Sequence, residues 1–191
     1  NGFGHDGGAI EINDGDFEKV DLYIHHNYSK DNQGFLENIQ SDCLSKDWVI
    51  AYNVCNDWQS WLGLTNVQDI RVEHNTVLRT RSHEGYNDFF WFNEDDKPNT
   101  VTLRNNIFVV GGGVPPIYYH GDGKRQHHDH NLYYAIDRST FEDGGNFSVL
   151  GTPLGKGEII ANPLFVNMEA GDYHLRAGSP AIDAGVDLKY K

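Results

Sequence analysis

Short runs in which apolar and polar residues alternate recur along the chain, and five of them end in asparagine. These runs are Asp21–Asn27, Val49–Asn53, Ile70–Asn75, Val101–Asn106 and His128–Asn131. Val, Ile, Leu, Tyr and Phe fill the alternating positions, which favours β-strands, and no amphipathic helical run lies between the copies. The asparagines recur at intervals of 22 to 31 residues. A strand-only repeat of this length is typical of a solenoid in which each repeat makes one turn and stacked turns form parallel sheets.

We expect the repeated asparagine to be structural. Asn tolerates the left-handed backbone conformation that bends a chain between sheets, and copies at the same point of every turn can stack and bond to one another. We therefore assign these residues no catalytic role. The histidines within the runs, His25, His26 and His74, are likewise predicted to pack at the turns.

A second strand repeats in the other half of each turn. Its aligned copies are Gly8–Ile12, Gly34–Asn38, Ser60–Leu64, Phe90–Glu94 and Ile117–Gly121. The alternation of a strand places one set inside, namely Ile10, Leu36, Leu62, Phe92 and Tyr119. Two columns then face outward. One is Ala9, Phe35, Trp61, Trp91 and Tyr118, and the other is Glu11, Glu37, Gly63, Asn93 and His120.

With these repeats in register, the chain resembles the right-handed parallel β-helix proteins of the pectate-lyase-like superfamily. Val72–Val77 and Leu103–Phe108 resemble its repeats, and the ending resembles the closing segment of many secreted members through Ala161–Phe165, Gly171–Leu175 and Gly178–Gly185. The resemblance implies an all-β, right-handed, single-stranded parallel β-helix of about six to seven turns. It also implies a single domain over 1–191, in which 1–135 form the repeat turns and 136–191 form the closing turns and a cap. The same resemblance implies an extracellular or cell-surface location.

The resemblance fixes the fold better than the chemistry. The superfamily contains polysaccharide lyases, glycoside hydrolases, epimerases and disaggregatase-type proteins, and one fold can host many functions.

Charge and composition exclude some partners. The 191 residues carry 15 Lys and Arg against 28 Asp and Glu, a formal net charge of −13, so no basic field exists to bind a nucleic acid. No apolar stretch is long enough to span a membrane. The chain begins with Asn1 and contains one Met, from which we expect a fragment whose upstream part is a partner within the same protein.

Candidate chemistry begins with the acids. Glu11 and Glu37 should be neighbours on an exposed sheet, about 4.7–4.9 Å apart between strands. Close carboxylates oppose the ionisation of both, and retaining glycosidases hold two carboxyls about 5–5.5 Å apart. Glu11 and Glu37 are thus the predicted catalytic pair, with Asp6 as a further acid. Stacked acids that bind Ca²⁺, or that only face water, are the alternative.

The aromatic column supplies the second argument. If exposed, Phe35, Trp61, Trp91 and Tyr118 present flat faces on which sugar rings pack. The alternative is that long loops cover the column and bury it. Asn93 and His120 are predicted to hold sugar hydroxyls, and His120 is also a candidate acid or base.

Histidine-rich and acidic runs are the candidates for metal binding, and two cysteines are the candidates for thiol chemistry. His127–His130 has the composition of a metal-binding run, but neighbouring residues of a strand face opposite sides, and we predict no metal ligand. Asp14–Glu18 and Glu94–Asp96 have the oxygen density that Ca²⁺ needs, which makes Ca²⁺ a candidate cofactor, although surface acidity explains both stretches. Cys43 and Cys55 are either buried thiols or a disulfide.

These features rank three functions. A lyase acting on a uronic-acid polymer needs a base, usually Lys, Arg or His, together with Ca²⁺. The two outward columns contain no Lys or Arg, and the negative net charge of the chain repels a polyanion. Basic candidates lie elsewhere, at Arg79, Arg81, Arg104, Lys124 and Arg125. We therefore predict first a glycoside hydrolase that cleaves a polysaccharide or oligosaccharide. A Ca²⁺-dependent lyase is second, and a non-catalytic glycan-binding or adhesive module is third.

Overall fold

The computed structural model describes residues 7–13, 17–39, 42–81, 89–93, 99–111, 119–120, 126–137, 142–143, 146–149 and 152–188. In this part of the chain the regular structure consists of β-strands two to seven residues long. The short strands follow from the sequence, because β-branched and aromatic residues alternate over only a few positions before a Gly, Asn or Asp turns the chain.

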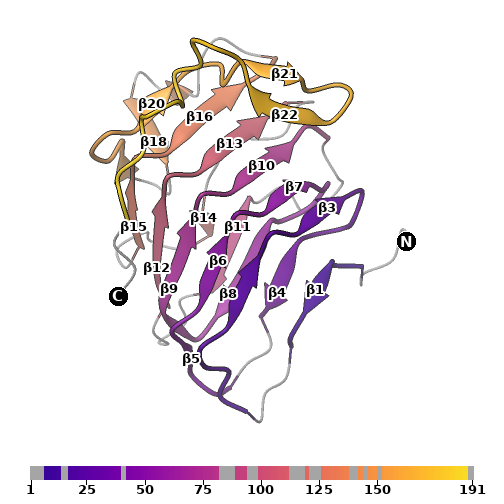
Figure 1. The fold of residues 1–191 in the computed structure, drawn as a ribbon. Coiled ribbons are helices and arrows are strands. Elements are labelled where there is room, and N and C mark those ends of the chain that lie inside the picture. The colour runs from indigo at the N-terminus through magenta and orange to yellow at the C-terminus, as the bar shows by residue number, and fades with distance from the viewer. Residues whose placement is uncertain are drawn as a thin grey trace.

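The strands form three parallel sheets that the chain visits in turn (Figure 1). Sheet A contains β1 (Ile10–Glu11), β4 (Leu36–Asn38), β8 (Leu62–Thr65), β11 (Phe90–Asn93) and β14 (Tyr119–His120). Sheet B contains β2 (Tyr23–His25), β6 (Val49–Ala51), β9 (Val67–Glu73), β12 (Asn99–Arg104) and β15 (Gln126–Asp129), and β5 (Ser45–Lys46) pairs with β9. Sheet C contains β3 (Tyr28–Lys30), β7 (Val54–Asn56), β10 (Thr76–Arg79), β13 (Ile107–Val110), β16 (Leu132–Ala135) and β20 (Ile159–Ile160).

The chain is therefore a parallel β-solenoid, as the repeats predicted, but with about four turns rather than six to seven. The difference arises after β16. There the chain forms the antiparallel strands β17 (Glu142–Asp143), β18 (Asn146–Val149) and β19 (Thr152–Pro153), and later the antiparallel pair β21 (Phe165–Asn167) and β22 (Asp172–Leu175). From this stretch only β20 joins the parallel sheets.

The inward faces of the three sheets meet in one apolar core. Leu36, Leu62 and Phe92, all predicted to point inward, are at most 2% exposed, and Ile10 packs against the same cluster. Residues of the other sheets complete the core, among them Ile50, Val72, Leu103, Val77 and Phe108.

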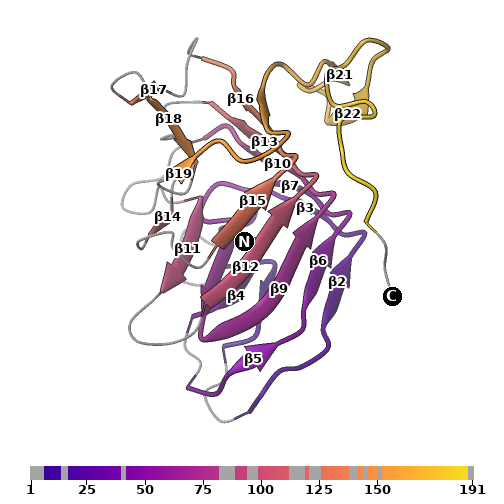
Figure 2. The ribbon, with the colours of Figure 1, turned by 90° about the vertical axis from the view of Figure 1, so that its left-hand side faces the viewer.

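A smaller cluster lies on the outer face of sheet C. Phe165 of the β21–β22 hairpin packs with Leu78 and Val109, which point away from the solenoid interior. Figures 1 and 2 show this hairpin beside the strands of sheet C. The amide of Asn56 donates to the hydroxyl of Tyr173 over 3.0 Å. The closing segment thus covers a sheet face instead of adding turns.

The repeated asparagines form a continuous hydrogen-bonded ladder at the corner between sheets B and C. From Asn27 to Asn131, each Nδ2 donates to the Oδ1 of the next ladder asparagine over 2.9–3.0 Å. The same Oδ1 atoms also accept the backbone N–H of the preceding ladder residue over 2.9–3.0 Å. The second Nδ2 hydrogen of Asn53, Asn75, Asn106 and Asn131 binds a strand carbonyl one turn back. The structural role predicted for these residues is confirmed.

The left-handed bend lies one residue before the one predicted. The residue preceding each ladder asparagine has φ between +53° and +58°, at His26, Tyr52, His74, Asn105 and His130. The ladder asparagine follows this bend, and its amide points into the stack. The side chains at the bend project outward, where the rings of His26 and Tyr52, and of Tyr52 and His74, stack with centroids 5.0–5.1 Å apart.

Glu158 ends the ladder at its C-terminal side. Its carboxylate accepts hydrogen bonds from Asn131 Nδ2, His128 Nδ1, Tyr133 Oη and Gly155 N over 2.6–2.8 Å. Burial opposes ionisation, but these hydrogen bonds outweigh it and hold the pKa of Glu158 below its ordinary value. A buried carboxylate thus supplies the acceptor that the next asparagine would otherwise provide.

We predict that Asn75→Ala lowers the free energy of unfolding by about 3 kcal/mol, because it leaves several buried partners unbonded. Asn27→Ala, at the exposed end of the ladder, should cost less than half as much. Urea unfolding of both variants measures the difference, and equal losses would contradict a ladder that stabilises the interior turns.

We predict that Glu158 makes stability depend on pH. Because its pKa is lowered in the folded chain, its contribution is present above the pKa of an unfolded Glu and is lost as the pH falls through the folded value. Glu158→Gln should therefore destabilise the chain near neutral pH, and the gap to the parent should narrow in acid. Thermal unfolding at a series of pH values tests this, and a gap that does not change with pH would count against it.

Candidate functional site

The predicted neighbours Glu11 and Glu37 are directly paired between β1 and β4. The outward column continues through Gly63, Trp91 and His120. The predicted alignment of the fourth copy is wrong by two residues, since Phe90 and not Phe92 lies opposite Leu62. A two-residue shift keeps every side chain on its face, but it moves Trp91 from the aromatic column into the column of the acids.

Phe35 and Trp61 do not form an exposed sugar platform, and that prediction is wrong. Each is 1% exposed and belongs to the main core. Both residues immediately precede a strand of sheet A, where the chain rounds a corner and an aromatic ring can turn inward. There Trp61 packs edge-on against Phe90 and Phe108, with centroids 5.7 Å apart in each case.

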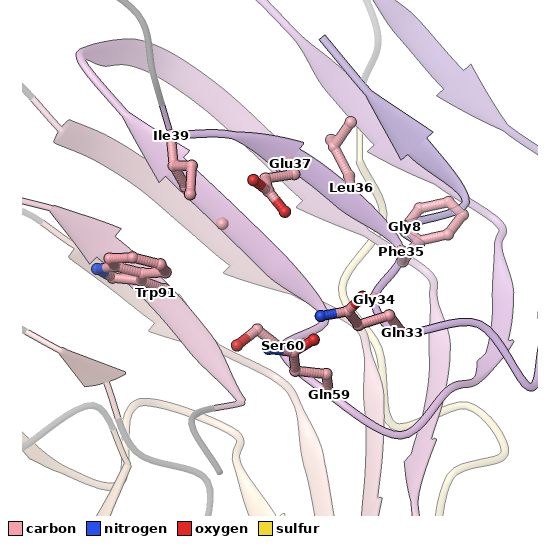
Figure 3. Close-up of a pocket in the computed structure, with 11 residues that line it drawn as sticks. Gly8, Gln33, Gly34, Phe35, Leu36, Glu37, Ile39, Gln59, Ser60 and Trp91 are labelled. Carbon is pink, nitrogen blue, oxygen red and sulfur yellow. The ribbon is translucent and has the colours of Figure 1, made fainter. Parts of the chain in front are cut away.

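A shallow groove of about 100 Å³ lies on the outer face of sheet A. Figure 3 shows Glu37 and Trp91 on this face, with Gln59 and Ser60 at one end of the groove. Gly63 lies between Glu37 and Trp91 in the column. Because it has no side chain, the space between these two residues stays open. A Cβ there would stand 2.9 Å from Ile39 Cγ2. The groove thus places one carboxylate and one half-buried indole two strands apart, with amide and hydroxyl groups beside them.

Neighbouring groups orient both acids. Asn13 Nδ2 donates to Glu37 Oε1 over 2.9 Å, while Asn13 Oδ1 accepts the backbone N–H of Ile39 over 2.8 Å. The exposed Glu11 accepts the backbone N–H of Gly8 over 2.9 Å. Glu37 lines the groove, whereas Glu11 lies on the adjoining strand beyond the lining residues.

Three lining residues, Gln33, Gln59 and Ser60, were not predicted. A signal for them exists in the sequence, because Gln33–Gly34 and Gln59–Ser60 stand at the same offset before aligned strands. Gly34 lets two turns approach closely, since a Cβ there would lie 2.6 Å from Ser60 O.

A buried polar network holds the loop that carries Gln33. Asp57 accepts the Ser29 hydroxyl over 2.5 Å and the Asn32 backbone N–H over 2.9 Å. Burial raises the pKa of the Asp57 carboxyl, despite these hydrogen bonds. The network therefore holds the backbone next to Gln33, at one edge of the groove.

The remaining predicted residues are only partly placed. Asn93 lies opposite Thr65 and His120 opposite Trp91, and their side chains are outside what the structure describes. Asp6 and Tyr118 lie outside the described residues altogether, as do the acidic stretches 14–16 and 94–96. Their predicted roles stay predictions.

The described basic residues do not line the groove. Arg79 is buried and donates to the Trp58 carbonyl over 3.3 Å. Arg81 pairs with Asp31 at 2.6 Å, and Arg104 makes two 2.6 Å bonds to Asp129. Lys124 and Arg125 lie outside the described residues.

The histidine run does not converge on one point. His128 bonds to Glu158, and His130 bonds to Asp129 over 2.8 Å. Among the residues that the structure describes, no three His, Cys, Asp or Glu side chains gather as metal ligands.

The two cysteines are free thiols. Cys55 is buried and Cys43 only half-buried, and burial raises the pKa of the Cys55 thiol well above its ordinary value. The disulfide alternative is therefore wrong.

Comparisons with protein-family models, with curated proteins and with solved structures found no match to this chain. The described part of the chain contains no helix with the length and apolar character needed to cross a bilayer. The fold and the groove therefore carry the functional argument.

We predict that Asn13→Asp destabilises the chain by about 1–2 kcal/mol near neutral pH, because it replaces a donor to Glu37 with a like charge. The loss should shrink in acid, where carboxyls are protonated. Asn13→Ala is the matched control, since it removes the hydrogen bond without adding charge. Urea unfolding at neutral and acidic pH tests this, and identical pH profiles for the two variants would argue against close contact with Glu37.

Proposed function

We propose that this chain is an extracellular glycoside hydrolase of the pectate-lyase-like kind that cleaves a neutral or weakly charged glycan on sheet A. The observation that carries the proposal is the outward column in which Glu11, Glu37, Gly63 and Trp91 follow one another on adjacent strands. A carboxylate pair and an aromatic side chain, separated by a residue without a side chain, suit a sugar ring lying between them.

In this mechanism the ring rests on Trp91 over Gly63, with its scissile bond toward the acids. Strand spacing places Glu11 and Glu37 about 4.7–4.9 Å apart at the backbone, which suits the carboxyl separation of about 5–5.5 Å in retaining enzymes. One carboxyl protonates the leaving oxygen, and the other attacks the anomeric carbon to form a glycosyl intermediate. The first carboxyl then deprotonates the water that releases the product. Gln33, Gln59 and Ser60 supply hydrogen bonds to sugar hydroxyls.

The arrangement of charge favours hydrolysis over lyase chemistry. A lyase needs a base and a cation that neutralises the uronate carboxylate. The described arginines bind acids or a backbone carbonyl away from the groove, while Glu37 brings negative charge into it. A neutral glycan avoids this repulsion.

A second candidate is a glycan-binding module without catalysis. It is favoured by the hydrogen bonds that tie Glu11 to Gly8 and Glu37 to Asn13, because both acids then have a local structural role. In such a module Trp91 matters for affinity and the carboxyls do not.

We predict that Glu11→Gln and Glu37→Gln each lower the rate of glycan cleavage by about 10²–10⁴-fold, since each removes an acid, base or nucleophile from the reaction. Trp91→Ala should weaken glycan binding by about 1 kcal/mol while the acids stay in place. Release of reducing ends from neutral and uronic polysaccharides gives the rates, and calorimetry gives the binding.

The outcomes separate the candidates. Reducing ends without the ultraviolet absorbance of an unsaturated uronate, lost in both Gln variants, support the hydrolase. Absorbance that a calcium chelator abolishes indicates a lyase. Binding that depends on Trp91, with no product in either assay, indicates the module.

A further inference from the structure

A second cavity, of about 370 Å³, lies between the C-terminal segment and the corner of sheets B and C. Its lining from the solenoid includes the aliphatic residues Ile107, Leu132 and Ile159, which are paired across β13, β16 and β20. The segment after β22, which Figure 2 shows running alongside the solenoid, adds apolar lining through Ala184 and Val186. The described lining shares no residue with the groove on sheet A.

Two anchors hold the C-terminal segment at this cavity. The hydroxyl of Ser179 donates to the Pro163 carbonyl over 2.6 Å. Further along, Asn105 Nδ2 donates to the Val186 carbonyl over 2.8 Å, and the Val186 N–H donates to Asn105 Oδ1 over 2.9 Å. Gly185 permits this close approach, since a Cβ there would lie 3.0 Å from Asn105 Oδ1. The residues between the anchors that line the cavity are therefore fixed at both ends.

The fixed charges of the lining are negative. Asp183 and Asp187 lie exposed on the C-terminal segment, and the described lining contains no Lys or Arg. His74 and His130 contribute imidazoles from the bends. His130 bonds to Asp129 over 2.8 Å, and burial lowers the pKa of His74, which favours its neutral ring near neutral pH. The cavity thus combines apolar walls with two carboxylates at its edge.

We propose that this cavity is a binding site for a small primary amine with an apolar body. The body would lie against Ile107, Leu132 and Ile159, and the ammonium would lie at the edge beside Asp183 or Asp187. The volume falls within the range of about 300–1,000 Å³ that is typical of small-molecule pockets. A cation fits better than an anion, because the two carboxylates and the net charge of −13 repel negative charge. This inference does not depend on the proposed hydrolase.

Phenethylamine is the direct probe, with phenethyl alcohol as the neutral control and hydrocinnamate as the anionic one. An NMR titration of the full chain gives the three affinities. We expect the amine to bind about fivefold more tightly than the alcohol, the modest gain of an ion pair at a solvent-exposed edge, and hydrocinnamate to bind more weakly than either. Nuclear Overhauser contacts from the phenyl ring to the methyl groups of Ile107, Leu132 and Ile159 should locate the bound probe.

Charge variants test the ion pair. Asp183 has a φ of +57°, a left-handed conformation that Asn also adopts, so Asp183→Asn removes the charge and keeps the backbone. It should reduce the preference for the amine over the alcohol, and adding Asp187→Asn should abolish it. Glu169→Gln is the matched control, because this exposed acid of the closing segment lies outside the cavity lining. It should leave the preference unchanged, and circular dichroism checks that each variant is folded.

Several outcomes would overturn the inference. They are equal affinity for the three probes, no binding of phenethylamine at millimolar concentration, and contacts from its ring to residues outside the cavity. A preference that survives in the double variant, or one that is lost in Glu169→Gln, would also overturn it. An amine preference that disappears only with Asp183 and Asp187, together with contacts to the three aliphatic residues, supports the site.

Discussion

Hydrogen bonds between stacked asparagines hold successive turns of the solenoid in register. A buried amide has two donors and an acceptor oxygen, and a stack of identical residues satisfies them only when successive turns repeat at strand spacing. Ladder residues Asn53, Asn75, Asn106 and Asn131 are at most 1% exposed, so misplacing a turn leaves polar groups unbonded in the interior. The ladder asparagines are 22 to 31 residues apart in the sequence. The corner they form is therefore the same in every turn, while the connecting loops vary in length.

Because the ladder fixes each turn at one corner, it also fixes which residues meet on the opposite sheet. Glu11 and Glu37 become neighbours, and Gly63 comes between Glu37 and Trp91. None of these residues touches the ladder. The groove nevertheless inherits its register from the ladder, and a slip of one residue would turn the acids inward.

The groove combines a small volume with few charges. Its carboxylate is held by Asn13, and one edge is held by the buried Asp57 network. In the proposed hydrolase, a fixed carboxylate in the same column as an indole would suit a ligand with an apolar face and hydroxyl groups, such as a sugar ring. Of the described arginines that were candidates for an anionic sugar, Arg81 and Arg104 are paired with acids and Arg79 is buried.

The class of fold, the asparagine stack and the pairing of Glu11 with Glu37 could all be predicted from local patterns, because strand alternation and a repeated asparagine are reproduced by stacking turn after turn. The number of turns could not, since an apolar run such as Phe165–Asn167 suits an antiparallel hairpin as well as a further rung. The tertiary structure also buried Phe35 and Trp61, and it placed Trp91 in the outward column of the acids, with Gly63 between Trp91 and Glu37. At a corner the direction of a side chain depends on the bend of the backbone and on the space available in the core. The alternation of apolar and polar residues determines neither.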